Sequence, residues 1–137
     1  MTGEFNWPVR VYYEDTDAAG IVFYANYLRY MERARTEWLR SVGYEHDMLK
    51  NKHGILFAVK NVAIEYVQPA YLDDLLMVTS SLLKKRGASL IFQQIIKNKN
   101  NELLIEAEIK VACLNAKTLK ASAMPEDLIT ELENNDT

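Results

Sequence analysis

One long amphipathic helix limits how this chain can fold more than any other feature of its sequence. In the segment 26–42 the apolar positions recur every three or four residues, as one face of a helix requires: Tyr27, Met31, Ala34, Trp38 and Val42. A helix of about 17 residues is roughly 26 Å long at 1.5 Å per residue. We expect Asn26 to cap its N-terminus and Gly43 to follow its C-terminus.

Most of the remaining chain has the period of strands. Alternation of apolar and polar residues predicts strands over about 9–14, 61–66, 75–84, 89–97 and 103–113, with a short helical turn near 45–51. A last short strand is expected to include Leu119 and Ala121, and Pro125 is expected to open a terminal helical turn. The polar, acidic segment 132–137 is expected to be a flexible tail, which leaves a single domain over 1–131.

One long helix followed by antiparallel strands defines an α+β class, in which a curled sheet of about five strands can bury the helix. The strand 89–97 carries apolar residues on both faces, with Leu90, Phe92 and Ile96 on one side and Ile91 and Ile95 on the other. A single sheet would leave one of these faces in water, so we expect a second subunit to cover it.

Charge and composition exclude several classes of protein. The net charge of −3 argues against a nucleic-acid-binding domain, which is usually basic. No apolar run approaches the roughly 20 residues of a membrane span, and the N-terminus lacks the pattern of a signal peptide. The lone Cys113 cannot form an internal disulfide. We therefore expect a protein that stays in the cytoplasm.

An acidic turn between the first strand and the helix is the main candidate for chemistry. Glu14, Asp15 and Asp17 place three carboxylates within four residues, just before Gly20. A carboxylate beside the free N–H groups of a helix start can activate water or attack a carbonyl, while the N–H groups hold the oxyanion. From spacing alone, an acidic turn that caps the helix is the more ordinary explanation.

Other candidates have simpler explanations. His46 and His53 lack a third ligand at a fitting spacing, so they are expected to be surface histidines and no metal site is expected. Cys113 belongs to the apolar face of a strand and is expected in the core. The run Lys84-Lys85-Arg86 at a predicted hairpin fits either solvated turn charges or a phosphate contact.

A family resemblance favours the acidic turn as a catalytic site. The segment 9–43 reads VRVYYEDTDAAGIVFYANYLRYMERARTEWLRSVG, and the later segments 64–66, 69–70, 72–74 and 86–89 read IEY, PA, LDD and RGAS. Over about residues 7–125 the sequence resembles the 4-hydroxybenzoyl-CoA thioesterase family, in particular the branch of bacterial acyl-CoA thioesterases associated with the Tol–Pal system. The resemblance implies a hotdog fold, dimers whose sheets join, tetramers built from such dimers, and active sites at the dimer interface.

The resemblance also assigns roles by position. It implies that Asp17 is the catalytic carboxylate, that the backbone N–H of Tyr24 receives the thioester oxygen, and that Tyr13 contributes to catalysis. Substrate contacts are implied at a further set of positions: Gly20, Val22, Lys85, Arg86 and Ser89. The Tol–Pal branch commonly has a histidine where this sequence has Tyr24, and two basic positions after Arg86 are here Gly87 and Ala88.

The expected function is hydrolysis of an acyl-CoA, with a short aliphatic or an aromatic acyl group, to a free acid and CoA. Asp17 would act as general base or as nucleophile, without a cofactor. Partners implied by the resemblance are a second copy of the chain and, beyond the substrate, an acyl carrier protein or lipid-synthesis enzymes. The alternative is a non-catalytic module that binds acyl-CoA or an acyl carrier in an envelope or lipid-synthesis complex. A hotdog hydratase is less favoured, because no histidine lies near Asp17.

Overall fold

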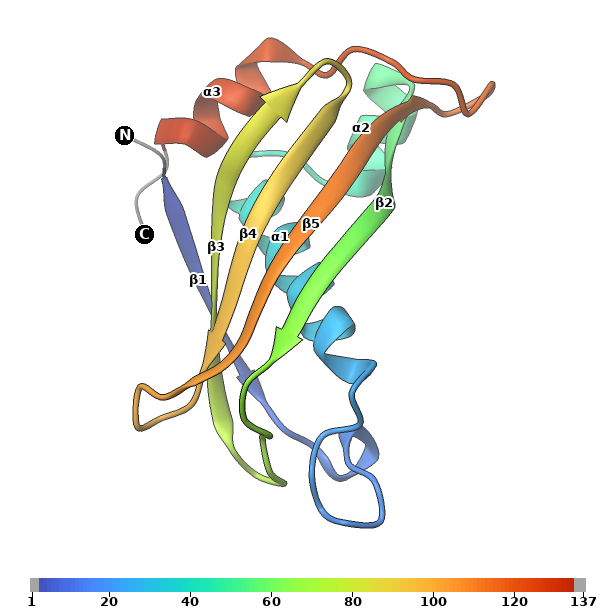
Figure 1. Cartoon of the computed structure of the whole chain (residues 1–137). Helices are drawn as coiled ribbons and strands as arrows, with labels where there is room; N and C mark the ends of the chain where they lie inside the picture. The colour runs from blue at the N-terminus through green and yellow to red at the C-terminus, as the bar shows by residue number, and fades with distance from the viewer. Residues whose placement is uncertain (1–2, 135–137) are drawn as a thin grey trace.

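An antiparallel sheet of five strands curves around one long helix in this computed structural model, which describes residues 3–134 (Figure 1). The strand order is β1-β3-β4-β5-β2. The strands are β1 (Glu4–Arg10), β2 (Ile55–Tyr66), β3 (Leu75–Arg86), β4 (Ser89–Lys97) and β5 (Leu103–Asn115). The helices are α1 (Asn26–Ser41), α2 (His46–His53) and α3 (Glu126–Asn134), and η1 (Tyr13–Asp15) is a short 3-10 turn.

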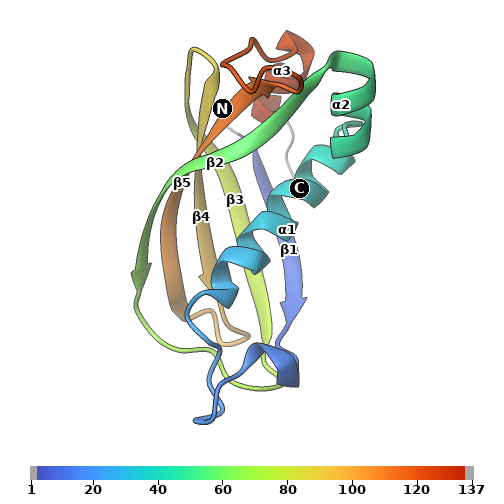
Figure 2. The same cartoon turned by 90° about the vertical axis from the view of Figure 1, so that its right-hand side faces the viewer.

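The core lies between α1 and the concave face of the sheet (Figure 2). The predicted helix face is confirmed, because Tyr27, Met31, Ala34 and Trp38 are all buried. Strand β4 turns alternate residues toward the helix, as the pleat requires. Its Phe92 ring lies 5.8 Å from the Trp38 ring. The α+β architecture predicted from periodicity is therefore confirmed.

The two ends of α1 differ in how well they were predicted. Gly43 follows the C-cap residue with φ 95°, a conformation that glycine adopts without strain, as expected. The N-cap prediction is wrong: Ala25 is the cap, and Asn26 is the first helical residue. The Asn26 side chain instead donates a hydrogen bond of 2.9 Å to the Asp15 carbonyl, which ties the helix to the preceding loop.

None of the helices in the described part of the chain has the length and apolarity that a membrane crossing requires.

The first strand lies earlier in the sequence than predicted. It ends at Arg10, and Tyr13 belongs to η1 rather than to a strand. The Asp15 side chain accepts a hydrogen bond of 2.8 Å from the Tyr12 N–H, and such a local bond competes with strand pairing. Pro8 is tolerated within β1 because this is an edge strand.

The C-terminal region corrects two predictions. No strand forms at Leu119–Ala121 within the described residues beyond one isolated bridge between Ala121 and Leu114, and Leu119 has φ 61°. The predicted tail begins too early, because α3 continues to Asn134 and Leu132 is fully buried. The amphipathic spacing of Leu128 and Leu132 outweighs the acidic composition of this helix. Residues 135–137 of the predicted tail lie outside the described residues.

The convex face of the sheet exposes apolar side chains on β3: Leu75, Met77 and Leu83 are 40%, 41% and 50% exposed. Ile91 and Ile95 of β4 are half-buried on the same face. These residues agree with the pattern from which a second subunit was predicted, and the subunit itself stays a prediction.

Candidate active site

The acidic turn folds into a closed loop directly before α1 (Figure 2). Thr16 and Val22 form an isolated bridge, and the Asp17 N–H donates to the Ile21 carbonyl at 2.9 Å. The loop is fastened to the segment after β2, because the Val22 N–H donates to the Ala70 carbonyl at 2.9 Å. These backbone bonds hold the loop at the N-terminal end of the helix.

Asp17 lies at the exposed tip of this loop. Its Oδ1 accepts a hydrogen bond of 2.8 Å from the Ala19 N–H, and its carbonyl accepts one of 3.0 Å from Gly20. Gly20 has φ 79°, a left-handed conformation that glycine adopts without strain. A Cβ at this position would meet no neighbour within 4 Å, so the backbone conformation and not a lack of space favours glycine there. Oδ2 of Asp17 accepts no hydrogen bond from residues 3–134, so it can face a ligand.

The other two carboxylates of the turn differ from Asp17. Asp15 is buried, its side chain holds the Tyr12 N–H, and its carbonyl accepts a 2.9 Å bond from the Phe23 N–H. Asp15 therefore shapes the loop. Glu14 is exposed on η1. Of the three, only Asp17 combines exposure with a side-chain oxygen that is fixed by the loop backbone.

The backbone around Tyr24 offers free donors. α1 begins two residues later, and the Tyr24 N–H donates no hydrogen bond within the described part of the chain. Its ring is exposed and packs against Phe23 and Tyr66, with centroids 4.8 Å and 6.3 Å away. The Tyr66 hydroxyl donates to the Tyr24 carbonyl at 3.1 Å. The positive end of the helix dipole adds to the field at this N–H.

Two further predicted residues of this region lie in different environments. Tyr13 is 83% exposed on η1, so its ring reaches solvent rather than a pocket of its own protomer. Val22 is 3% exposed. Its side chain belongs to the core, and a contact between Val22 and the substrate stays a prediction.

The basic residues predicted to contact CoA are at the opposite end of the sheet. Lys85 and Arg86 end β3, and Ser89 begins β4, at the hairpin seen at the top of Figure 1. The Asp17 loop lies at the bottom of that view, near the start of β3. The twelve residues of β3 are joined by eleven steps, which give the strand a length of about 36 Å at roughly 3.3 Å per step. One protomer therefore does not bring these residues to Asp17.

The sequence analysis did not predict the buried hydrogen bond that holds the segment to which the Asp17 loop is bonded. The Tyr27 hydroxyl accepts a hydrogen bond of 3.0 Å from the Ala70 N–H, and burial raises the pKa of Tyr27. The protonated phenol thus holds the segment to which the Asp17 loop is bonded. The sequence signal for this contact was the pair Pro69-Ala70, which is one of the segments that carry the family resemblance.

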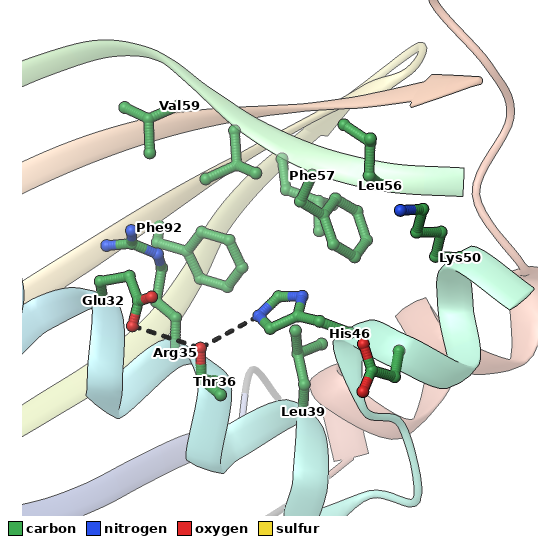
Figure 3. A pocket seen from close by; sticks show the side chains of 13 residues that line it. Glu32, Arg35, Thr36, Leu39, His46, Lys50, Leu56, Phe57, Val59 and Phe92 are labelled. Atoms are coloured by element: carbon green, nitrogen blue, oxygen red, sulfur yellow. Dashed lines mark hydrogen bonds between the residues drawn. The ribbon is translucent and has the colours of Figure 1, made fainter. Parts of the chain in front are cut away.

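A cavity of about 390 Å³ was also missed; it lies between α1, α2 and β2 (Figure 3). His46, predicted to be a surface histidine, is exposed at its edge, with Nε2 3.0 Å from the Thr36 hydroxyl.

Cys113 is fully buried, as predicted, and burial raises the pKa of its thiol. Within residues 3–134, no three His, Cys, Asp or Glu side chains form a group that could hold a metal ion.

Known proteins resemble this chain along nearly its whole length. Residues 11–132 match the model of the thioesterase-like superfamily. The protein named acyl-CoA thioester hydrolase YbgC from Escherichia coli O6:H1 is 43% identical over 129 residues, which cover 94% of this chain and 96% of that one.

Two solved structures share the fold. A 1,4-dihydroxy-2-naphthoyl-CoA thioesterase from Synechocystis has a TM-score of 0.89 at 22% identity, over 96% of this chain and 97% of that chain. A mutant 4-hydroxybenzoyl-CoA thioesterase in complex with 4-hydroxybenzoyl-CoA has a TM-score of 0.87 at 20% identity, over 94% and 98%. The hotdog fold expected from the resemblance is confirmed.

Proposed function

The chain belongs to the thioesterase-like superfamily, and from this premise we propose that it is an enzyme that hydrolyses acyl-CoA thioesters to a free acid and CoA. The observation that carries the proposal is the 43% identity to an acyl-CoA thioester hydrolase over nearly the whole of both chains. The loop that presents a fixed, exposed Asp17 beside the start of α1 supports it independently.

In the proposed reaction, Asp17 provides the carboxylate that drives addition to the thioester carbonyl. As a general base it takes a proton from water, the water oxygen bonds to the carbonyl carbon, and the C–S bond then breaks. The thiolate of CoA leaves and takes up a proton. As a nucleophile, Asp17 would instead form a mixed anhydride that water opens in a second step. The free Oδ2 of Asp17 suits either role.

The proposed oxyanion donor is the Tyr24 N–H. Its lack of another acceptor within residues 3–134 and its place two residues before α1 support this role. Because the donor is a backbone group, tyrosine in place of histidine leaves it intact. The Tyr24 side chain supplies no imidazole, so a mechanism that needs one is not proposed. Tyr13 is proposed to reach the site from the exposed turn η1.

We propose that the complete site needs a second copy of the chain. The Asp17 loop and the hairpin of Lys85, Arg86 and Ser89 lie at opposite ends of β3, a strand about 36 Å long, which supports this. A two-fold axis through the edge strand β2 would reverse the sheet and bring the hairpin of one copy to the loop end of the other. Light scattering after gel filtration should give a dimer or a dimer of dimers, and a strict monomer would contradict this proposal.

Cellular context is proposed from the resemblance alone. It comprises a cytoplasmic location, an association with the Tol–Pal system, and acyl carrier protein or lipid-synthesis enzymes as partners. Affinity purification of the tagged chain from its own cells would test these partners. A short aliphatic or an aromatic acyl group is proposed as the substrate.

The experiment that tests the proposed activity is a panel of acyl-CoA and aroyl-CoA esters incubated with purified protein. A thiol-reactive dye detects the released CoA. The background from the protein should be low, because Cys113 is buried and its thiol pKa is raised. Thiol release with at least one ester is the expected result. Binding of the esters without any release would favour the non-catalytic acyl-CoA binding module.

A further inference from the structure

The two groups of the proposed reaction, the Asp17 carboxylate and the Tyr24 N–H, lie seven residues apart on one loop. Gly20 lies between them, and glycine gives a segment more conformational freedom than any other residue. Both groups must face the same thioester carbonyl, and a misplacement of about 1 Å can lower a rate by on the order of 10²-fold. The contacts that hold one end of the loop against the other therefore matter for turnover.

The two ends of the loop meet at the backbone carbonyl of Asp15, directly before α1 (Figure 2). This oxygen accepts a hydrogen bond of 2.9 Å from the Phe23 N–H and another of 2.9 Å from Nδ2 of Asn26. Asp15 lies two residues before Asp17, and Phe23 lies one residue before Tyr24. One carbonyl thus joins the acidic turn to the segment of the proposed oxyanion donor.

Asn26 also holds the peptide group that carries this donor. Its backbone N–H donates a hydrogen bond of 2.8 Å to the Phe23 carbonyl. That carbonyl and the Tyr24 N–H belong to one planar peptide group, so a bond to the oxygen fixes the direction of the N–H. The backbone of Asn26 therefore orients the donor, and its side chain fastens the donor to the acidic turn.

The side-chain bond of Asn26 differs in reach from the others that involve the acidic turn. Within residues 3–134, the side-chain bonds of Asp15, Thr16 and Asp17 connect positions two or three apart. The bond from Asn26 connects positions eleven apart and crosses the whole loop. It forms between a half-buried amide and a buried residue, where water competes less for the donor.

We propose that Asn26 is a positioning residue, whose side-chain amide holds the Asp17 turn and the Tyr24 peptide at the separation that the reaction needs. The inference rests on the proposed function, because it assigns Asn26 a part in that same site. Asn26→Ala removes only the bond from the side chain to the Asp15 carbonyl. This oxygen keeps the Phe23 N–H, and alanine is the better helix former, so the fold should stay intact.

The test compares kcat, KM and Tm of Asn26→Ala with those of the wild type, on an acyl-CoA that the wild type hydrolyses. The kcat should fall by about tenfold or more, while KM stays within about threefold and Tm within a few degrees. Arg29→Ala is the matched control, because Arg29 is exposed on the same turn of α1. It should keep the kcat of the wild type.

Hydrogen exchange followed by NMR tests the contact without turnover. The Phe23 N–H shares its acceptor with the Asn26 side chain, so it should exchange several-fold faster in Asn26→Ala than in the wild type or in Arg29→Ala. Unchanged exchange at Phe23 would overturn the inference.

The kinetic outcomes separate this inference from the proposed function. A folded Asn26→Ala with the kcat of Arg29→Ala would refute the positioning role and leave the proposed hydrolysis intact. A loss of kcat that only follows a large fall in Tm would reduce Asn26 to a structural residue and would also overturn the inference. Failure of the wild type to hydrolyse any ester would refute the proposed function and the positioning role together.

Discussion

The buried amide of Gln94 should be the most sensitive polar position in the fold. Its side chain is fully buried and takes part in hydrogen bonds with Arg35, Met31 and Ser80. Gln94→Leu keeps roughly the same size and removes all three bonds. It leaves the Arg35 guanidinium without the acceptor at 2.8 Å and the Ser80 hydroxyl without its donor.

The expected cost follows from these bonds. A hydrogen bond to a charged group contributes about 1.5–3 kcal/mol and a neutral one about 1 kcal/mol, so the three together contribute roughly 3–5 kcal/mol. Leucine recovers about 1 kcal/mol through its additional apolar burial. We expect Gln94→Leu to lower the free energy of unfolding by about 2–4 kcal/mol. For a chain of this size that corresponds to a fall in Tm of roughly 6–12 °C.

Urea unfolding at one fixed protein concentration is the assay, because self-association would shift apparent stability with concentration. Gln93→Leu is the control: Gln93 is the neighbouring residue, half-buried on the opposite face of β4. It should change the free energy of unfolding by less than about 0.5–1 kcal/mol. If the two variants are equally stable, the Gln94 hydrogen bonds do not stabilise the fold as argued.

Two more predictions concern α3 and a buried phenol. Leu132→Ala should cost about 2–5 kcal/mol of unfolding free energy in urea, since Leu132 is fully buried; a loss near zero would restore the predicted tail. Burial, with a smaller contribution from the Asp15 carboxylate, raises the pKa of Tyr30. An unfolded tyrosine titrates near pH 10, so the stability from this phenol is present below that pH and is lost as pH rises above it. Tyr30→Phe should therefore lose less stability than wild type between about pH 9 and 11 in parallel melts, and identical slopes would contradict the pKa shift.

Periodicity predicted those parts of the fold in which one physical effect dominates. The face of α1 that carries Met31 and Trp38, and the strand 89–97, follow from the need to bury apolar side chains at helical and strand spacing. The errors lie where local hydrogen bonds compete with that need. Asp15 caps a turn that ends the first strand early, and Asn26 reaches back to that turn rather than capping its own helix.

The candidate site was less predictable because its parts come from distant segments. Asp17 and Tyr24 share one loop, so a local motif could identify both. The bond from the Ala70 N–H to the Tyr27 hydroxyl joins residues 43 positions apart, and no spacing rule predicts it. Val22 belongs to the same motif, and the motif did not reveal that its side chain faces the core.

The place of Arg35 also depends on tertiary structure. Its position beside the apolar helix face was visible in the sequence, but the facing Gln94 was not. The distance between the Asp17 loop and Arg86 likewise follows only from the strand order and direction. A pattern of residue types identified the chemistry of single groups, and the sheet topology decided which groups can meet.

The kcat of Asp17→Asn on an acyl-CoA that the wild type hydrolyses tests the proposed mechanism most directly, with Glu14→Gln as the matched control. Both variants replace an exposed carboxylate of the same turn by its amide. We expect Asp17→Asn to lower kcat by on the order of 10²-fold or more while Glu14→Gln stays within a few-fold of wild type. Turnover by a folded Asp17→Asn protein at the rate of Glu14→Gln would contradict the assignment of Asp17 as the catalytic carboxylate.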